Sequence, residues 1–148
     1  MKITQTMIIM FIGSFIVQYF IMPPIMVSNY MYVTNSIGKA YLAGIMGTLM
    51  VIIEIMMRDH QYHVLSLNWY AILFALLAAL IYAYRKQTAI NDKQYLEGMI
   101  EHHSMALFTS NEILKKTNNY DVTKLAKNII SQQSDELRVM RDLLKEKI

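Results

Sequence analysis

The most unusual chemical feature of this sequence is a pair of adjacent histidines, His102 and His103, that closely follows Met99. On a helix, Met99 lies three residues before His102 and four before His103, so the three side chains can share one broad face. Imidazole nitrogen binds copper, zinc, iron and nickel, whereas thioether sulfur favours Cu(I). Adjacent helical residues point about 100° apart, so both histidines do not automatically reach one ion.

Further potential ligands lie in a second segment with apolar periodicity, which contains Gln132, Gln133, Glu136 and Met140. If the turn between the segments is centred at Asn119–Tyr120, residues whose numbers sum to about 239 face each other in a hairpin. This register predicts that His103 lies near Glu136 and that Met99 lies near Met140. Two His with Met favour copper, whereas two His with Glu favour zinc or iron. The alternative is a polar layer in which the histidines hydrogen-bond to the glutamine and glutamate side chains.

Helical periodicity surrounds both groups of side chains. Asn91 or Asp92 is a plausible N-cap for the first helix, and apolar residues then recur at helical spacing. A polar turn at residues 117–120 follows, and Asp121 or Thr123 can cap a second helix that runs nearly to the end of the chain. A lone hairpin of this size buries too little apolar surface to be stable. We therefore expect it to pack on the rest of the chain, on a second copy, or on both.

The rest of the chain differs from this segment in its charge. The sequence has 148 residues, of which 55% are hydrophobic and 17% are charged. Only five charged side chains precede residue 85, and these are Lys2, Lys39, Glu54, Arg58 and Asp59. A water-soluble domain mixes its charges throughout. The pattern therefore predicts a transmembrane region at residues 1–86 and a helical hairpin domain at residues 87–148.

Three apolar stretches are long enough to cross a membrane, at about residues 5–24, 40–57 and 64–84. Pro23 and Pro24 are expected to end or kink the first span near Met22. A cleaved signal peptide is the alternative for this stretch, although it lacks a small-residue cleavage site. In the second span, Gly44 and Gly47 are expected to let helix backbones approach closely.

Glu54 is a charged residue near one end of the second span, four residues before Arg58. The carboxylate could reach the headgroup region beside Arg58, or it could be a functional acid within the membrane. Lysine and arginine are nearly balanced between alternate loops. The positive-inside rule therefore leaves the sidedness of the hairpin open.

Composition also excludes several function classes. The absence of cysteine excludes disulfides, thiolate metal sites and cysteine nucleophiles. The net charge of +3 is not concentrated in one block, so nothing suggests nucleic acid as a partner. The sequence has no phosphate-binding glycine loop and no zinc-protease motif. We therefore expect no enzymatic activity, and the expected partners are the lipid bilayer and further copies of the chain.

Two runs of residues carry a resemblance to a known family. The first run is Asp92, Tyr95-Leu96, Met99-Ile100, His102-His103 and Ala106, and the second is Leu125-Ala126, Ile129-Ile130, Gln132-Gln133, Glu136-Leu137 and Met140. Over roughly residues 91–147 the chain resembles the domain of unknown function 305 family. Tyr41–Gly47 is also similar to a Tyr-Met-Ala-x-x-Met-Gly stretch in its small three-span membrane members.

The resemblance implies a helical, ferritin-like fold and, for some members, copper handling outside the cytoplasm. The positions that match the family pattern are Met99, His102, His103, Glu136 and Met140. Many members have proline at the position of Glu101. Without that proline, the helix of this chain can run unbroken through the histidine pair.

These observations predict an all-α membrane protein with three transmembrane helices and a C-terminal antiparallel helical hairpin, which is half of a ferritin-like bundle. The leading hypothesis is non-catalytic binding of a metal, preferably copper, for metal handling or sensing. His102, His103, Met99 and Met140 would be ligands, and Glu136 would be a ligand or would orient an imidazole. The alternative is a structural membrane protein whose hairpin mediates oligomerisation. A ferritin-like oxidase is a third hypothesis, but the tail lacks the Glu-x-x-His motif and would need a dimer.

Overall fold

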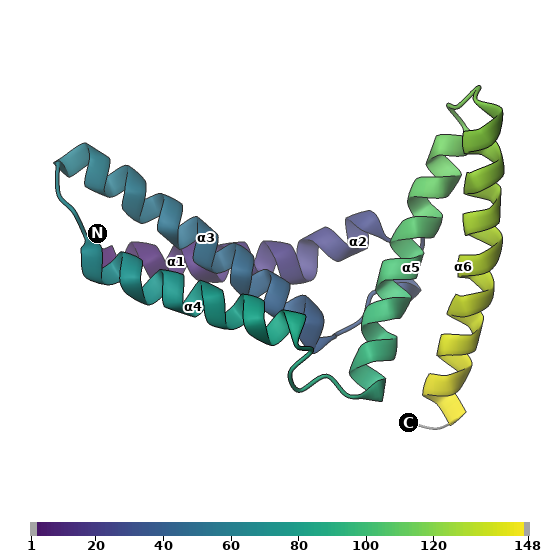
Figure 1. The fold of residues 1–148 in the computed structure, drawn as a ribbon, viewed down its shortest axis with the longest axis horizontal. Coiled ribbons are helices and arrows are strands. Elements are labelled where there is room, and N and C mark those ends of the chain that lie inside the picture. The colour runs from purple at the N-terminus through teal and green to yellow at the C-terminus, as the bar shows by residue number, and fades with distance from the viewer. Residues whose placement is uncertain (1–2, 147–148) are drawn as a thin grey trace. The chain divides into compact units, whose positions relative to one another are not determined.

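The computed structural model describes residues 3–146, and within them the chain is helical without any β-strand. The elements are α1 (Ile3–Ile16), the π-helical η1 (Val17–Ile21), α2 (Met22–Met26), the 3₁₀-helical η2 (Tyr30–Tyr32), α3 (Ile37–Tyr62), α4 (Leu67–Arg85), α5 (Asp92–Leu114) and α6 (Tyr120–Glu146) (Figure 1). Apolar helices come first and two further helices follow them. The predicted all-α fold class is therefore confirmed.

Three helical stretches within residues 3–146 are long and apolar enough to cross a membrane. They are Ile3–Met26, Ile37–Tyr62 and Leu67–Arg85. The first two extend beyond the predicted limits of residues 5–24 and 40–57, because helical backbone continues into flanking residues that are less apolar. The third begins later than predicted, at Leu67 instead of Val64, because a turn occupies the residues before it.

The first apolar helix does not end at its two prolines. Helical backbone continues through Pro23 and Pro24 to Met26, and the π-helical η1 lies immediately before them. Proline has no N–H group and crowds the carbonyl group four residues earlier. A π-helical turn is one of the local adjustments that accommodate such residues in apolar helices.

The described residues form two compact units. One contains the chain up to Ile21 together with Gly38–Ala89, and the other contains Met22–Ile37 together with the chain from Ile90 onward. This division differs from a split between residues 86 and 87 mainly at Met22–Ile37. That segment packs with the hairpin, although it contains the end of the first apolar helix and the loop that leads to the second.

The first unit is centred on α3. Its buried core consists of Met7 from α1, Val51, Ile52 and Ile55 from α3, and Leu73 from α4. Helices α1 and α3 approach closely at Gly47. A Cβ atom there would lie 2.9 Å from the Phe11 ring and 3.1 Å from the Phe11 carbonyl oxygen. Glycine is therefore required at this position for the observed packing, as the small-residue pattern predicts.

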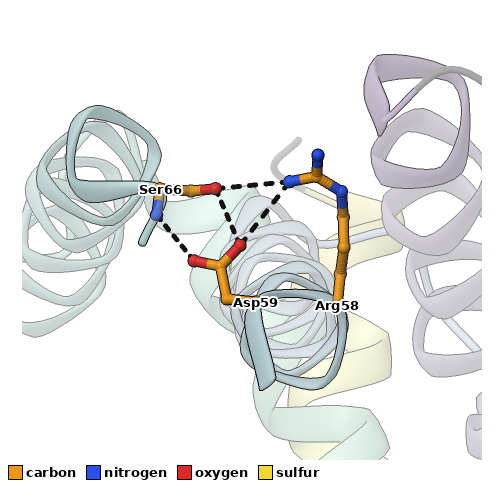
Figure 2. A network of polar contacts seen from close by, with 3 residues as sticks. All are labelled: Arg58, Asp59 and Ser66. Carbon is orange, nitrogen blue, oxygen red and sulfur yellow. Dashed lines mark hydrogen bonds and ion pairs between the residues drawn. The ribbon is translucent and has the colours of Figure 1, made fainter. Parts of the chain in front are cut away.

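A buried carboxylate closes the turn between α3 and α4 (Figure 2). Asp59 Oδ2 accepts a hydrogen bond of 2.6 Å from the Ser66 backbone N–H, and Oδ1 accepts one of 2.8 Å from the Ser66 hydroxyl group. The Arg58 guanidinium lies 3.5 Å from Asp59 Oδ1 and 3.3 Å from Ser66 Oγ. Arg58 therefore contacts Asp59, and Arg58 and Glu54 both line a cavity of about 460 Å³.

In the second unit, α5 and α6 run antiparallel and pack along their length (Figure 1). Asn91 caps α5 by accepting a hydrogen bond of 3.0 Å from the Gln94 N–H, as predicted. The cap of α6 was predicted at Asp121 or Thr123, but it is Asn119, whose Oδ1 accepts from the N–H groups of residues 121 and 122. The helix begins earlier than predicted because an asparagine side chain can satisfy two of the free N–H groups at its start.

Candidate functional site

The register of the hairpin brings the predicted His–Glu pair together. His103 Nε2 on α5 lies 2.7 Å from Glu136 Oε2 on α6, which confirms that residues whose numbers sum to about 239 face each other. Met140 is buried in the same apolar cluster against which Met99 packs. The hairpin therefore aligns an imidazole, a carboxylate and two thioethers along the contact between its helices.

His103 is held at both ring nitrogens. Nδ1 lies 2.8 Å from the Met99 carbonyl oxygen, which can only accept, so Nδ1 carries a proton and donates it. Nε2 faces α6 and lies 2.7 Å from Glu136 Oε2, which is within hydrogen-bond distance. His103 is 7% exposed, so this buried contact ties the two helices together at one level.

His102 does not join this pair. Its side chain is exposed, and its ring centroid lies 6.2 Å from that of His103 with the planes at 68°. Adjacent helical residues diverge by about 100°, which accounts for the difference. Among residues 3–146, no three His, Cys, Asp or Glu side chains gather closely enough to hold a metal ion. The metal set of Met99, His102, His103, Glu136 and Met140 therefore stays a prediction.

Residues 22–37 cover one side of α5 through polar contacts that the sequence pattern does not reveal. The Ser28 N–H donates to Ser104 Oγ at 2.9 Å, and the two hydroxyl groups lie 2.9 Å apart. The Thr34 N–H donates to Glu101 Oε2 at 3.0 Å, and the Ile37 N–H donates to the Gln94 side chain. Ser104 has no exposed surface. Loss of one of these partners would therefore leave a buried polar group unsatisfied.

The only signal of this contact in the sequence is a polar stripe on α5. Glu97, Glu101 and Ser104 recur at helical spacing among apolar residues. Such a stripe is usually solvated, but here Glu101 is 6% exposed. A buried carboxylate requires hydrogen-bond donors, and Thr34 supplies its backbone N–H and its hydroxyl group to Glu101 Oε2.

The other side of the hairpin is uncovered, and we call it the open face. It contains Tyr95, Met99, His102, Ala106 and Ile113 from α5, and Val122, Leu125, Ile129, Gln132, Glu136, Val139 and Leu143 from α6. These residues recur at spacings of three and four on α6 and of three, four and seven on α5, so each helix presents one stripe. Leu125 is 61% exposed, and Tyr95 and Val139 are each 54% exposed. The hairpin thus presents a long apolar stripe with His102 and Glu136 near its middle.

The fold and this hairpin define an all-α protein in which apolar helices of membrane-spanning length precede a polar helical hairpin. The family model described as Domain of unknown function (DUF305) matches residues 78–144, which contain the end of α4 and nearly all of the hairpin. The chain belongs to this family.

A curated relative is similar over nearly the whole chain. It is "Uncharacterized protein L153" of Acanthamoeba polyphaga mimivirus, which is 30% identical over 141 residues that cover 95% of this chain and 91% of the relative. No solved structure matches this chain.

Proposed function

We propose that this protein is a multi-pass integral membrane protein whose C-terminal hairpin pairs with the hairpin of a second copy. The membrane assignment is supported by the length and apolar character of the three candidate spans. The pairing is supported by the open face, which leaves large apolar side chains of both α5 and α6 in solvent. Exposed contiguous apolar surface is typical of an interaction site.

The main support for the pairing is that the open faces of two copies are complementary. At each height along the helices, the residues that would meet have compatible side chains. A two-fold axis parallel to the helices would set α5 of each copy against α6 of the other, antiparallel, as in a four-helix bundle. Residues whose numbers sum to 238 would then meet across the interface. Ile113 would meet Leu125, Met99 would meet Val139, and Tyr95 would meet Leu143, so apolar side chains meet apolar side chains.

The polar residues of the open face match in the same way. His102 of each copy would meet Glu136 of the other, because their numbers also sum to 238. The exposed imidazole of His102 is a hydrogen-bond donor, and the Glu136 carboxylate has a second oxygen besides the one bonded to His103. Pairing would thus give the exposed imidazole of His102 a carboxylate acceptor from the other copy.

Sedimentation of the full-length protein in detergent tests this proposal, with the bound detergent counted separately. We expect two copies in each particle at micromolar concentration. A single copy at every concentration would contradict the pairing.

Metal binding is a second candidate, favoured by the orientation of His103. Its Nδ1 bond to the Met99 carbonyl oxygen fixes the tautomer and directs Nε2 to Glu136, which is a typical arrangement for a ligating imidazole. Within one copy only this nitrogen and the Glu136 carboxylate converge, so the donor set is incomplete. Pairing would add His102 of the second copy as a third donor. Met99 and Met140 would supply thioether sulfur suited to Cu(I).

Titration of the detergent-purified protein with Cu(I) and Cu(II) distinguishes these candidates. A metal site predicts that the His102→Ala/His103→Ala variant loses at least about tenfold in affinity, which corresponds to about 1.4 kcal/mol. The His60→Ala/His63→Ala variant is the matched control, since both histidines lie in the first unit. Equal affinity in the two variants would contradict a metal site at the hairpin, while leaving the pairing of hairpins intact.

A further inference from the structure

Basic side chains line a pocket on the hairpin. The pocket lies on the side that residues 22–37 cover. Its volume is about 220 Å³, and its lining contains Tyr32, Leu107, Ser134, Leu137, Arg138, Arg141, Asp142 and Lys145. The Arg141 guanidinium lies over the Tyr32 ring, 5.6 Å from its centroid. This cation–π contact holds the guanidinium beside the ring.

The basic residues form one stripe on the last turns of α6. Arg138, Arg141 and Lys145 are three and four residues apart, so they project from one side of the helix. Asp135 pairs with Arg138 at 3.3 Å, and Asp142 also lines the pocket. Three cations against these two carboxylates still leave a net charge of +1 at the pocket. The Ser134 hydroxyl adds a neutral hydrogen-bonding group.

If the apolar helices span a membrane, as proposed above, the connectivity of the chain keeps this pocket close to its surface. Tyr32 belongs to residues 27–36, which join two helices of membrane-spanning length. Both ends of such a loop lie at the same surface of the bilayer. Its middle can therefore extend only about 18 Å from that surface, at roughly 3.6 Å per residue. Tyr30 and Met31, beside Tyr32, are 78% and 70% exposed and suit the interfacial region.

We propose that this pocket binds a phosphate group, and that the phosphate belongs to the headgroup of an anionic phospholipid. Two arginines and a lysine are suited to phosphate oxygens, because guanidinium groups can donate two parallel hydrogen bonds. Basic side chains held at a bilayer surface attract anionic lipids. This proposal rests on the proposed membrane assignment but not on the pairing of the hairpins, since the pocket lies on the covered side.

Native mass spectrometry of the full-length protein tests the proposed lipid binding. Phosphatidylglycerol or phosphatidylcholine is added to the detergent micelles. We expect the protein to retain phosphatidylglycerol in preference to phosphatidylcholine. The Arg138→Gln/Arg141→Gln/Lys145→Gln variant should bind phosphatidylglycerol roughly tenfold to a hundredfold more weakly. The Lys115→Gln/Lys116→Gln/Lys124→Gln variant loses the same charge near the turn end of the hairpin and should retain the preference.

Two further measurements make the result decisive. Arg141→Lys keeps the charge but loses the planar fork, so it should bind phosphatidylglycerol more weakly than the wild type even if the triple variant fails to fold. Equal lipid retention in the wild type, the triple variant and Arg141→Lys would overturn the proposal. Millimolar inorganic phosphate distinguishes the two sources of the group. Binding of free phosphate without any preference between the lipids would overturn the lipid assignment.

Discussion

Glutamate in place of both Leu125 and Val139 is expected to separate the paired hairpins into single copies. Both side chains are more than half exposed in one chain, at 61% and 54%, so the variant should fold normally. In the pair each glutamate would face apolar side chains of the other copy, and burial of an unpaired carboxylate is strongly unfavourable. We expect at least about hundredfold weaker association, equivalent to about 2.8 kcal/mol, measured by dilution of fluorescently labelled copies.

The matched control places two glutamates elsewhere on the same helix. Ser131 and Ser134 are exposed on α6 and lie outside the open face. Ser131→Glu/Ser134→Glu adds the same charge to the chain and should associate like the wild type. If both double variants associate equally well, the open face is not the surface that pairs.

Alanine in place of Gly47 is expected to destabilise the first unit, although alanine is the better helix former. The added Cβ atom would lie 2.9 Å from the Phe11 ring and 3.1 Å from its carbonyl oxygen, so the backbones of α1 and α3 must separate. Overpacking of this kind costs about 1–3 kcal/mol. This exceeds the gain of about 1 kcal/mol from replacing glycine in a helix. The Tm of the detergent-solubilised protein should therefore fall.

Gly44→Ala provides the control, one turn earlier on the same helix. There the added Cβ atom would lie 3.4 Å from a methyl group of Leu80, which is an ordinary van der Waals contact. The Tm should stay the same or rise slightly, because the gain in helix propensity is not opposed. A Tm for Gly47→Ala equal to that for Gly44→Ala would show that α1 and α3 do not touch at Gly47.

The sequence predicts the helices and the register of the hairpin because both depend on local rules. Apolar periodicity and the Asn91 cap locate α5. A turn near Asn119 then sets the register, because each residue adds an equal rise on two straight helices. The contact between His103 and Glu136 follows from this arithmetic. Composition likewise predicts the apolar helices, since their length and lack of charge require no knowledge of packing.

The packing of residues 22–37 on the hairpin is not predictable in the same way. Its contacts join Ser28 to Ser104 and Thr34 to Glu101, which are far apart in the sequence and polar, so no periodicity reveals them. The residue type also does not reveal which of the two adjacent histidines is buried, because both positions are histidine. Only the rotation of α5 relative to α6 decides that His103 is buried and His102 is exposed.

Disulfide formation between two single-cysteine variants tests the pairing of the hairpins most directly, because the chain has no cysteine of its own. Ala106→Cys and Gln132→Cys lie on the open face at one level, on α5 and α6 respectively. Glu112→Cys and Lys127→Cys also lie at one level, but neither residue belongs to the open face, and they form the control pair. When full-length copies are mixed and oxidised, we predict a covalent dimer from the first pair well above that from the control pair. Equal amounts of covalent dimer from the two mixtures would contradict the pairing.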